Sequence, residues 1–243
     1  MRALVLLLVL LAVSAPAAAG CLVALDVGHY TESPGETSAR GVPELVFNQG
    51  LAHRLEVALK AADIAVTVIN ADGSIRDLAE RPRRAREAGA SLLLSLHHDS
   101  VQDRYKSPWT WEGREQVYSD IFSGYGLFIS ALNPAFAESR QVATDLGERL
   151  RKAGLKPSLH HAETIPGESR PLLDDRRGIY RYDELAVLRQ ATMPAVLIEA
   201  GIIVNRDDEP VLASDAFRAQ TAQAVVQAVR AHCHRLEAAG QIN

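Results

Sequence analysis

From Leu22 onward, short apolar runs alternate with longer amphipathic stretches. The apolar runs are rich in β-branched residues and mostly lack polar alternation, a pattern typical of strands that are buried on both faces. They cover Leu22–Val27, Ile64–Ile69, Ser91–Leu96, Gly126–Ser130 and Ala195–Glu199. Strands that alternate with helices indicate βαβ units. We therefore predict an α/β fold, a single domain with an open, mainly parallel sheet and helices on both faces.

The amphipathic stretches predict the helices. Residues Glu44–Ala61 carry leucines at helical spacing and follow a proline, which a helix start tolerates. Ser74 with Asp77 resembles a capping box for the next helix, and Ser139 is expected to open another. The last helix is predicted from about Ser214, with Phe217, Val225, Val229 and Leu236 on its apolar side.

Two stretches break the alternation, and we predict both to be long loops. Val101–Ser123 contains Trp109 and Trp111, the only tryptophans, and Pro157–Tyr182 is rich in Pro, Gly and charge. Loops of this length in a compact domain are usually functional or mobile.

The first 20 residues have the composition of a secretory signal: Arg2, an apolar run over Ala3–Val13, then small residues at 17–19. The apolar run is too short to span a bilayer comfortably, and no second one follows. We expect a catalytic domain of residues 21–243, exported to the periplasm or cell envelope without a transmembrane anchor.

The two cysteines, Cys21 and Cys233, are expected to form a disulfide in an oxidising compartment. Cys21 also follows Ala-Ala-Gly, which weakly resembles a lipoprotein processing site. Lipid attachment at Cys21 is the alternative.

The net charge of the chain excludes one class of partner. Without the first 20 residues, 25 basic residues stand against 30 acidic ones, a net charge of −5. This balance argues against nucleic acid as a partner, because phosphate recognition usually needs a basic excess. The one concentrated basic segment, Arg81–Arg86, is interpreted as the solvated face of a helix.

Three reactive side chains stand where predicted strands end. His29 follows the first strand, His97 follows the third, and Glu199 ends the late apolar run. The carboxyl ends of parallel strands share one edge of a sheet, where ligands bind, so these groups are expected to converge. Glu44 opens the first helix after the His29 loop and is delivered to the same edge.

Two imidazoles and one carboxylate with an open fourth position form a known zinc arrangement for hydrolysis. We predict one zinc ion per chain, held by His29, Glu44 and His97. Glu199 is the predicted general base, because a charge after a fully apolar strand would be costly without a compensating role. His98 would point to the opposite face of its strand and is expected to be structural or to support a ligand.

The other histidines are interpreted as surface or core residues, and Glu163 is a weak candidate for extending the site. These histidines are His53, His160, His161, His232 and His234.

The ordered motifs resemble those of the zinc-dependent N-acetylmuramoyl-L-alanine amidases, which separate stem peptides from the glycan of bacterial peptidoglycan. The motifs are Asp26-Val27-Gly28-His29; Glu44 with Asn48; Leu78 and Arg81 leading to Ser95-Leu96-His97; and Val187-Leu188-Arg189 before Pro194–Glu199 and Asn205. The resemblance implies the same metal ligands and the same catalytic glutamate. Two positions depart from it: Tyr30-Thr31 follow the first histidine, and His98-Asp99 follow the second.

The resemblance implies peptidoglycan as the substrate, with Arg189, Trp109 and Trp111 as candidate substrate contacts. A zinc peptidase acting on wall peptides and a non-catalytic wall-binding protein are the alternatives. Some relatives cover the zinc with a helical insertion that a partner withdraws. The short segment Ala131–Glu138 leaves no room for such a helix, so we predict that an activator protein is unnecessary. Within Val101–Ser123, Glu112 or Glu115 could instead form a lid over the site.

Overall fold

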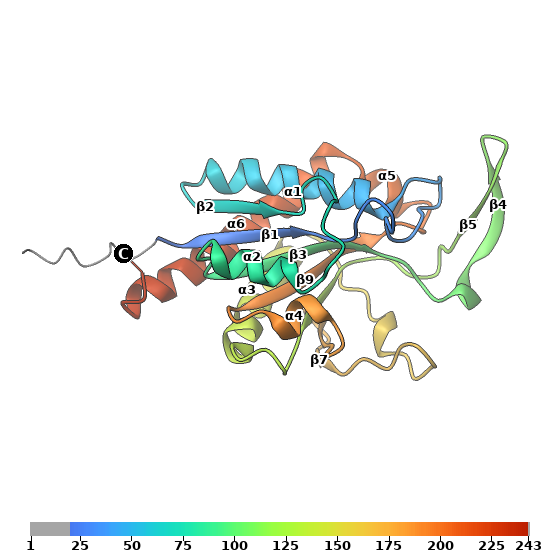
Figure 1. Cartoon of the computed structure of the whole chain (residues 1–243). Coiled ribbons are helices and arrows are strands. Elements are labelled where there is room, and N and C mark those ends of the chain that lie inside the picture. Colours follow the sequence, from blue (N-terminus) through green and yellow to red (C-terminus); the bar gives the residue numbers. More distant parts are fainter. Residues whose placement is uncertain (1–19, 243) are drawn as a thin grey trace, which may run out of the picture.

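A computed structural model describes residues 20–242, and the predicted signal segment lies outside them except for Gly20. Within these residues, nine strands and six α-helices follow one another, and Figure 1 shows how they are arranged. The strands are β1 (Leu22–Val27), β2 (Ala65–Ile69), β3 (Leu92–Asp99), β4 (Ser107–Trp111), β5 (Arg114–Tyr118), β6 (Gly126–Ile129), β7 (Leu172–Asp174), β8 (Ile179–Arg181) and β9 (Ala195–Ile202). The α-helices are α1 (Glu44–Lys60), α2 (Glu80–Glu87), α3 (Phe136–Lys152), α4 (Ala186–Gln190), α5 (Asp208–Leu212) and α6 (Asp215–Ala238).

Seven strands form one sheet in the order β2-β1-β3-β9-β6-β8-β7. The first four run parallel, β6 is antiparallel to β9, and β8 is parallel to β6. This confirms the α/β fold and the mainly parallel sheet. Side chains of β1 and β3 alternate between two buried clusters, which explains why these strands show no polar alternation.

Helices cover both faces of the sheet, as predicted. Helices α1, α3 and α6 pack on one face around the larger apolar core, and α2 and α4 contact each other on the other face. Helix α6 begins at Asp215, close to the predicted start at about Ser214, and the Ser214 side chain caps it by accepting a hydrogen bond from the backbone N–H of Phe217. The part of the chain described contains no helix that is long and apolar enough to cross a membrane.

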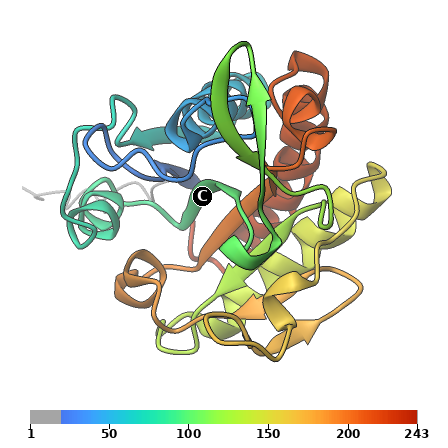
Figure 2. The ribbon, with the colours of Figure 1, turned by 90° about the vertical axis from the view of Figure 1, so that its right-hand side faces the viewer.

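Four predictions of local structure are wrong. The Ser74–Asp77 segment does not cap a helix, because Asp77 accepts from the backbone of Ala79 in a turn and α2 begins only at Glu80. Helix α3 begins at Phe136, before Ser139, whose hydroxyl accepts from the N–H of Ala195 and so ties α3 to β9. The predicted loop Val101–Ser123 contains the two-stranded β4–β5 sheet, which projects beyond the end of the main sheet (Figure 1) and faces the viewer in Figure 2. The other predicted loop, Pro157–Tyr182, contains the short strands β7 and β8.

Candidate active site

His29 follows β1 in a left-handed backbone conformation, with φ of 67°. A residue other than glycine adopts this conformation only where its surroundings enforce it. Two buried side chains do so here: Asn70 Nδ2 donates to the His29 carbonyl oxygen at 2.7 Å, and Arg81 donates to the same oxygen. The backbone that orients the first imidazole is therefore fixed by one side chain directly after β2 and one in the first turn of α2.

Arg81 is only 1 % exposed, so the prediction of a solvated basic face at Arg81–Arg86 is wrong for this residue. Its guanidinium lies 3.4 Å from Asp26 Oδ1 and donates to the Val27 carbonyl oxygen at 2.9 Å. Burial raises the pKa of Asp26, and the charge of Arg81 together with a hydrogen bond from Ser95 opposes that rise. A buried carboxylate needs a buried counter-charge, which is the physical reason for the inward orientation of Arg81.

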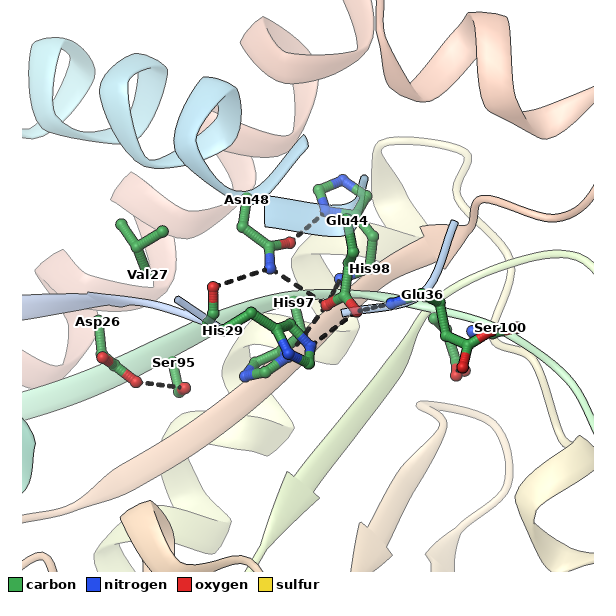
Figure 3. A network of polar contacts seen from close by, with 12 residues as sticks. Asp26, Val27, His29, Glu36, Glu44, Asn48, Ser95, His97, His98 and Ser100 are labelled. Atoms are coloured by element: carbon green, nitrogen blue, oxygen red, sulfur yellow. Dashed lines mark hydrogen bonds and ion pairs between the residues drawn. The ribbon is translucent and has the colours of Figure 1, made fainter. Parts of the chain in front are cut away.

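Glu44 connects the two imidazoles (Figure 3). Its Oε2 lies 2.7 Å from His29 Nε2, and its Oε1 lies 3.1 Å from His97 Nδ1. One ligand atom from each of the three residues falls within 4.8 Å of the others. A set of two imidazoles and one carboxylate at these separations suits a zinc ion.

Glu44 is buried at the start of α1, and its charge is stabilised from several sides. Burial opposes ionisation, but hydrogen bonds with His29 and His97 outweigh it and hold the pKa of Glu44 well below its usual range. Oε1 also accepts from Asn48 Nδ2 and from the backbone N–H of His98, each at 3.1 Å. The carboxylate is thus ionised and fixed in position.

His98 supports Glu44 through a neighbour, as the strand alternation predicted. Its Nδ1 lies 2.8 Å from Asn48 Oδ1, and its ring packs against Phe47. Burial lowers the pKa of His98 to about 3, so the ring is neutral near pH 7.

Two glycines make room for the ligands. A Cβ on Gly28 would lie 2.4 Å from the His97 ring. A Cβ on Gly35, where φ is +81°, would lie 2.4 Å from Glu44 Oε2 and 2.8 Å from His29 Nε2. Neither position tolerates a side chain without displacing a candidate ligand.

Glu199 lies beside this group, because it pairs with His97 in the β3–β9 register. Its Oε2 is buried and has no hydrogen-bond partner among the described residues. Burial raises the pKa of Glu199 well above its usual value, and the nearby charges of Asp99 and Glu44 add to the rise. All four predicted residues line one cavity of about 430 Å³.

A family model described as N-acetylmuramoyl-L-alanine amidase matches residues 23–231. The chain belongs to this amidase family. It is 24 % identical over 229 residues to probable N-acetylmuramoyl-L-alanine amidase AmiB of Haemophilus influenzae, covering 86 % of this chain and 51 % of that protein. Over 222 residues it is also 24 % identical to N-acetylmuramoyl-L-alanine amidase AmiC of Neisseria meningitidis, covering 86 % and 52 %. The chain thus spans about half the length of these relatives.

Solved structures of cell-wall amidases share the fold. Ami1 from Mycobacterium smegmatis superposes with a TM-score of 0.68 at 22 % identity, covering 90 % of this chain and 99 % of that one. The catalytic domain of CwlV from Bacillus (Paenibacillus) polymyxa gives a TM-score of 0.65 at 23 % identity, covering 87 % and 97 %.

The three candidate substrate contacts do not line the cavity of this amidase-family chain. Arg189 is exposed on α4, which packs with α2 on the face opposite the larger core. Trp109 and Trp111 lie on β4 with their rings tilted and their centroids 5.4 Å apart, and the Arg40 guanidinium carbon lies over the Trp111 ring, 4.9 Å from its centroid. Glu112 and Glu115, the candidates for a lid, are exposed at the far end of the same hairpin.

The cavity includes residues that the sequence reasoning missed. Asp99 follows His97 on β3, while His161 and Glu168 come from the predicted loop Pro157–Tyr182. Burial disfavours the charge of His161, but Asp99 and Glu168 outweigh it and raise its pKa to about 9. Glu163 instead accepts from the Tyr105 hydroxyl, outside the cavity lining. The only available signal was the length of the loop, since an irregular segment has no periodicity that orients its side chains.

Proposed function

We propose that the protein hydrolyses the amide bond between N-acetylmuramic acid and L-alanine in peptidoglycan, using a zinc ion bound by His29, Glu44 and His97. The observation that carries this proposal is the buried Oε2 of Glu199. It has no hydrogen-bond partner among the described residues, yet it faces a cavity shared with two imidazoles and a second carboxylate. A binding module has no need for a free carboxylate at that point.

Each residue has a distinct role in this proposal. Zinc held by His29, Glu44 and His97 would supply Lewis acidity for the attack of water on the scissile carbonyl. Glu199 accepts a proton from the attacking water and passes it to the departing amine. Its raised pKa makes it a stronger base than an exposed carboxylate. Asn48 and the His98 N–H hold Glu44 in place, and Arg81 with Asn70 holds His29.

We further propose that the chain is exported, on the strength of the basic and apolar pattern of its first 20 residues. Peptidoglycan would then be available to it in the periplasm or cell envelope.

Product analysis tests the function. The purified protein, without any added partner, is incubated with defined muropeptides and the products are separated and weighed by mass spectrometry. We expect free stem peptides with an N-terminal L-alanine and glycan without peptide, and no such products from metal-stripped protein. Cleavage within the stem peptide would identify a peptidase instead, and intact muropeptides with zinc-loaded protein would contradict the proposal.

A further inference from the structure

A second group of two imidazoles and a carboxylate lies apart from the His29–Glu44–His97 centre. His161 Nε2 lies 2.8 Å from Asp99 Oδ2, and His160 Nε2 lies 3.4 Å from the same oxygen. The centroids of the two rings lie 3.9 Å apart at an interplanar angle of 36°, and the three ligand atoms fall within 4.8 Å of one another. One residue from β3 and two from a distant loop thus bring three possible metal-ligand atoms together.

The opposite nitrogen of each ring is already fixed. His160 Nδ1 lies 2.8 Å from the Ser158 hydroxyl, and His161 Nδ1 lies 2.8 Å from Glu168 Oε2. Glu168 is held in turn by Gln102 Nε2 at 2.9 Å. Proteins orient metal-binding histidines in this way, with the nitrogen that does not bind the metal held by a carboxylate or another polar group.

His160 provides an independent observation. His160 is only 2 % exposed. Its Nε2 lies 3.4 Å from Asp99 Oδ2 but has no hydrogen-bond partner among residues 20–242. Buried polar atoms are nearly always satisfied, so an orphaned nitrogen that faces a carboxylate needs an explanation. A cation between the two groups would satisfy both.

Binding of an anion does not fit this group. Both nitrogens of His161 face carboxylates, those of Asp99 and Glu168, so the ring has no free donor for a carboxylate or an oxyanion of a ligand. Carboxylates outnumber fixed positive charges around the same cavity: its lining has six acidic residues against Arg104 and Lys106. The charge balance favours a bound cation.

We propose that Asp99, His160 and His161 bind a second divalent transition-metal ion, with Glu168 and Ser158 orienting the two histidines. Two imidazoles and one carboxylate suit zinc and its neighbours in the first transition row, and not calcium or magnesium, which prefer oxygen ligands. Because Asp99 and His161 line the cavity that also contains His97, the ion faces the same space as the first centre. This inference does not depend on the bond that the protein cleaves.

Metal stoichiometry tests the proposal. The metal-stripped protein is titrated with Zn²⁺ by calorimetry, and bound zinc is counted by elemental analysis after dialysis. We expect two equivalents for the unaltered protein, one for His161→Gln, one for His97→Ala and none for the double variant. His53→Gln, which changes an exposed histidine, should keep both equivalents.

His160→Gln is the second variant, in case His161→Gln does not fold, and circular dichroism checks the fold of each. A single equivalent in the unaltered protein, lost in His97→Ala and kept in His161→Gln, would overturn the second site and leave the first intact. Two equivalents that persist in both His160→Gln and His161→Gln would also overturn it. If His97→Ala bound as much zinc as the unaltered protein, the result would instead count against the first centre.

Discussion

At the scale of single residues, the candidate site depends on a glycine that leaves room for the ligands as much as on the ligands themselves. Gly35 lies against Glu44 and His29, and its backbone has φ of +81°. Any side chain there would be strained by the positive φ and would also collide with the side chains of two candidate ligands. The geometry of the metal centre therefore depends on a glycine at position 35, which both the loop conformation and the two ligand side chains require.

Gly35→Ala should weaken zinc binding severely. A matched control is Gly89→Ala, which has a similar φ of +76° but no neighbouring atom within 4 Å of its Cβ. Both variants carry a backbone cost of roughly 1–2 kcal/mol, but only Gly35→Ala displaces Glu44 and His29. Zinc affinity measured by competition with a chelator distinguishes them, and equal affinities would contradict the proposed crowding.

Arg81→Ala should destabilise the fold by about 3–5 kcal/mol, because it leaves Asp26 buried without its counter-charge. Arg83→Ala is the control, since Arg83 is exposed and pairs only with Glu87 and Glu80 on the same helix; a change of at most about 1 kcal/mol is expected. Urea unfolding of both variants measures the difference. A similar stability for the two would show that Arg81 is not the electrostatic partner of Asp26.

The sequence predicted His29, His97 and Glu199 because it placed each at the carboxyl end of a parallel strand, so that strand direction alone brings the residues together. In the structure His29 follows β1, and His97 and Glu199 pair with each other inside β3 and β9, which continue to Asp99 and Ile202. The sequence could not predict His161 or Glu168, which come from a segment without periodicity. It also could not show that Arg81 turns inward, because an amphipathic helix with four arginines looks the same in sequence whether one of them is buried or none is.

At the scale of elements, the β4–β5 hairpin is the main departure from the prediction. Its signals were present in the sequence: alternating aromatic residues at Trp109 and Trp111, and a two-residue Glu112-Gly113 turn, in which both residues adopt positive φ. Strands β7 and β8 have only three residues each and no such signal, because the neighbouring sheet determines their conformation.

The hairpin is predicted to hold extended substrate rather than to cover the site, because its glutamates are exposed and its tryptophans do not line the cavity. Replacing Pro108–Val117 with two glycines joins Ser107 and Tyr118, which already pair in the ladder. We expect slower dye release from sacculi and an unchanged rate on small muropeptides. A clear rise in rate on either substrate would show that the hairpin is a lid.

At the scale of the whole molecule, a disulfide joins Cys21, just before β1, to Cys233 in α6, at a sequence separation of 212. On the chain-entropy model, a loop of this length contributes up to about 5 kcal/mol to stability. Cys233→Ser should therefore lower the free energy of unfolding by up to that amount, measured in denaturant without reductant.

Intact mass checks the pairing in the exported protein. The bridge predicts a loss of two hydrogens, and reduction should restore them. A diacylglycerol increment would show lipid attachment at Cys21, which is incompatible with the bridge.

The central claim is that Glu199 acts as the base beside a metal held by His29, Glu44 and His97. The most direct measurement compares turnover of a defined muropeptide and zinc content in Glu199→Gln and in the unaltered protein. The amide keeps the size of the side chain but cannot accept a proton, so turnover should fall roughly 10²- to 10⁴-fold with zinc content unchanged. A near-normal rate in Glu199→Gln would contradict the account.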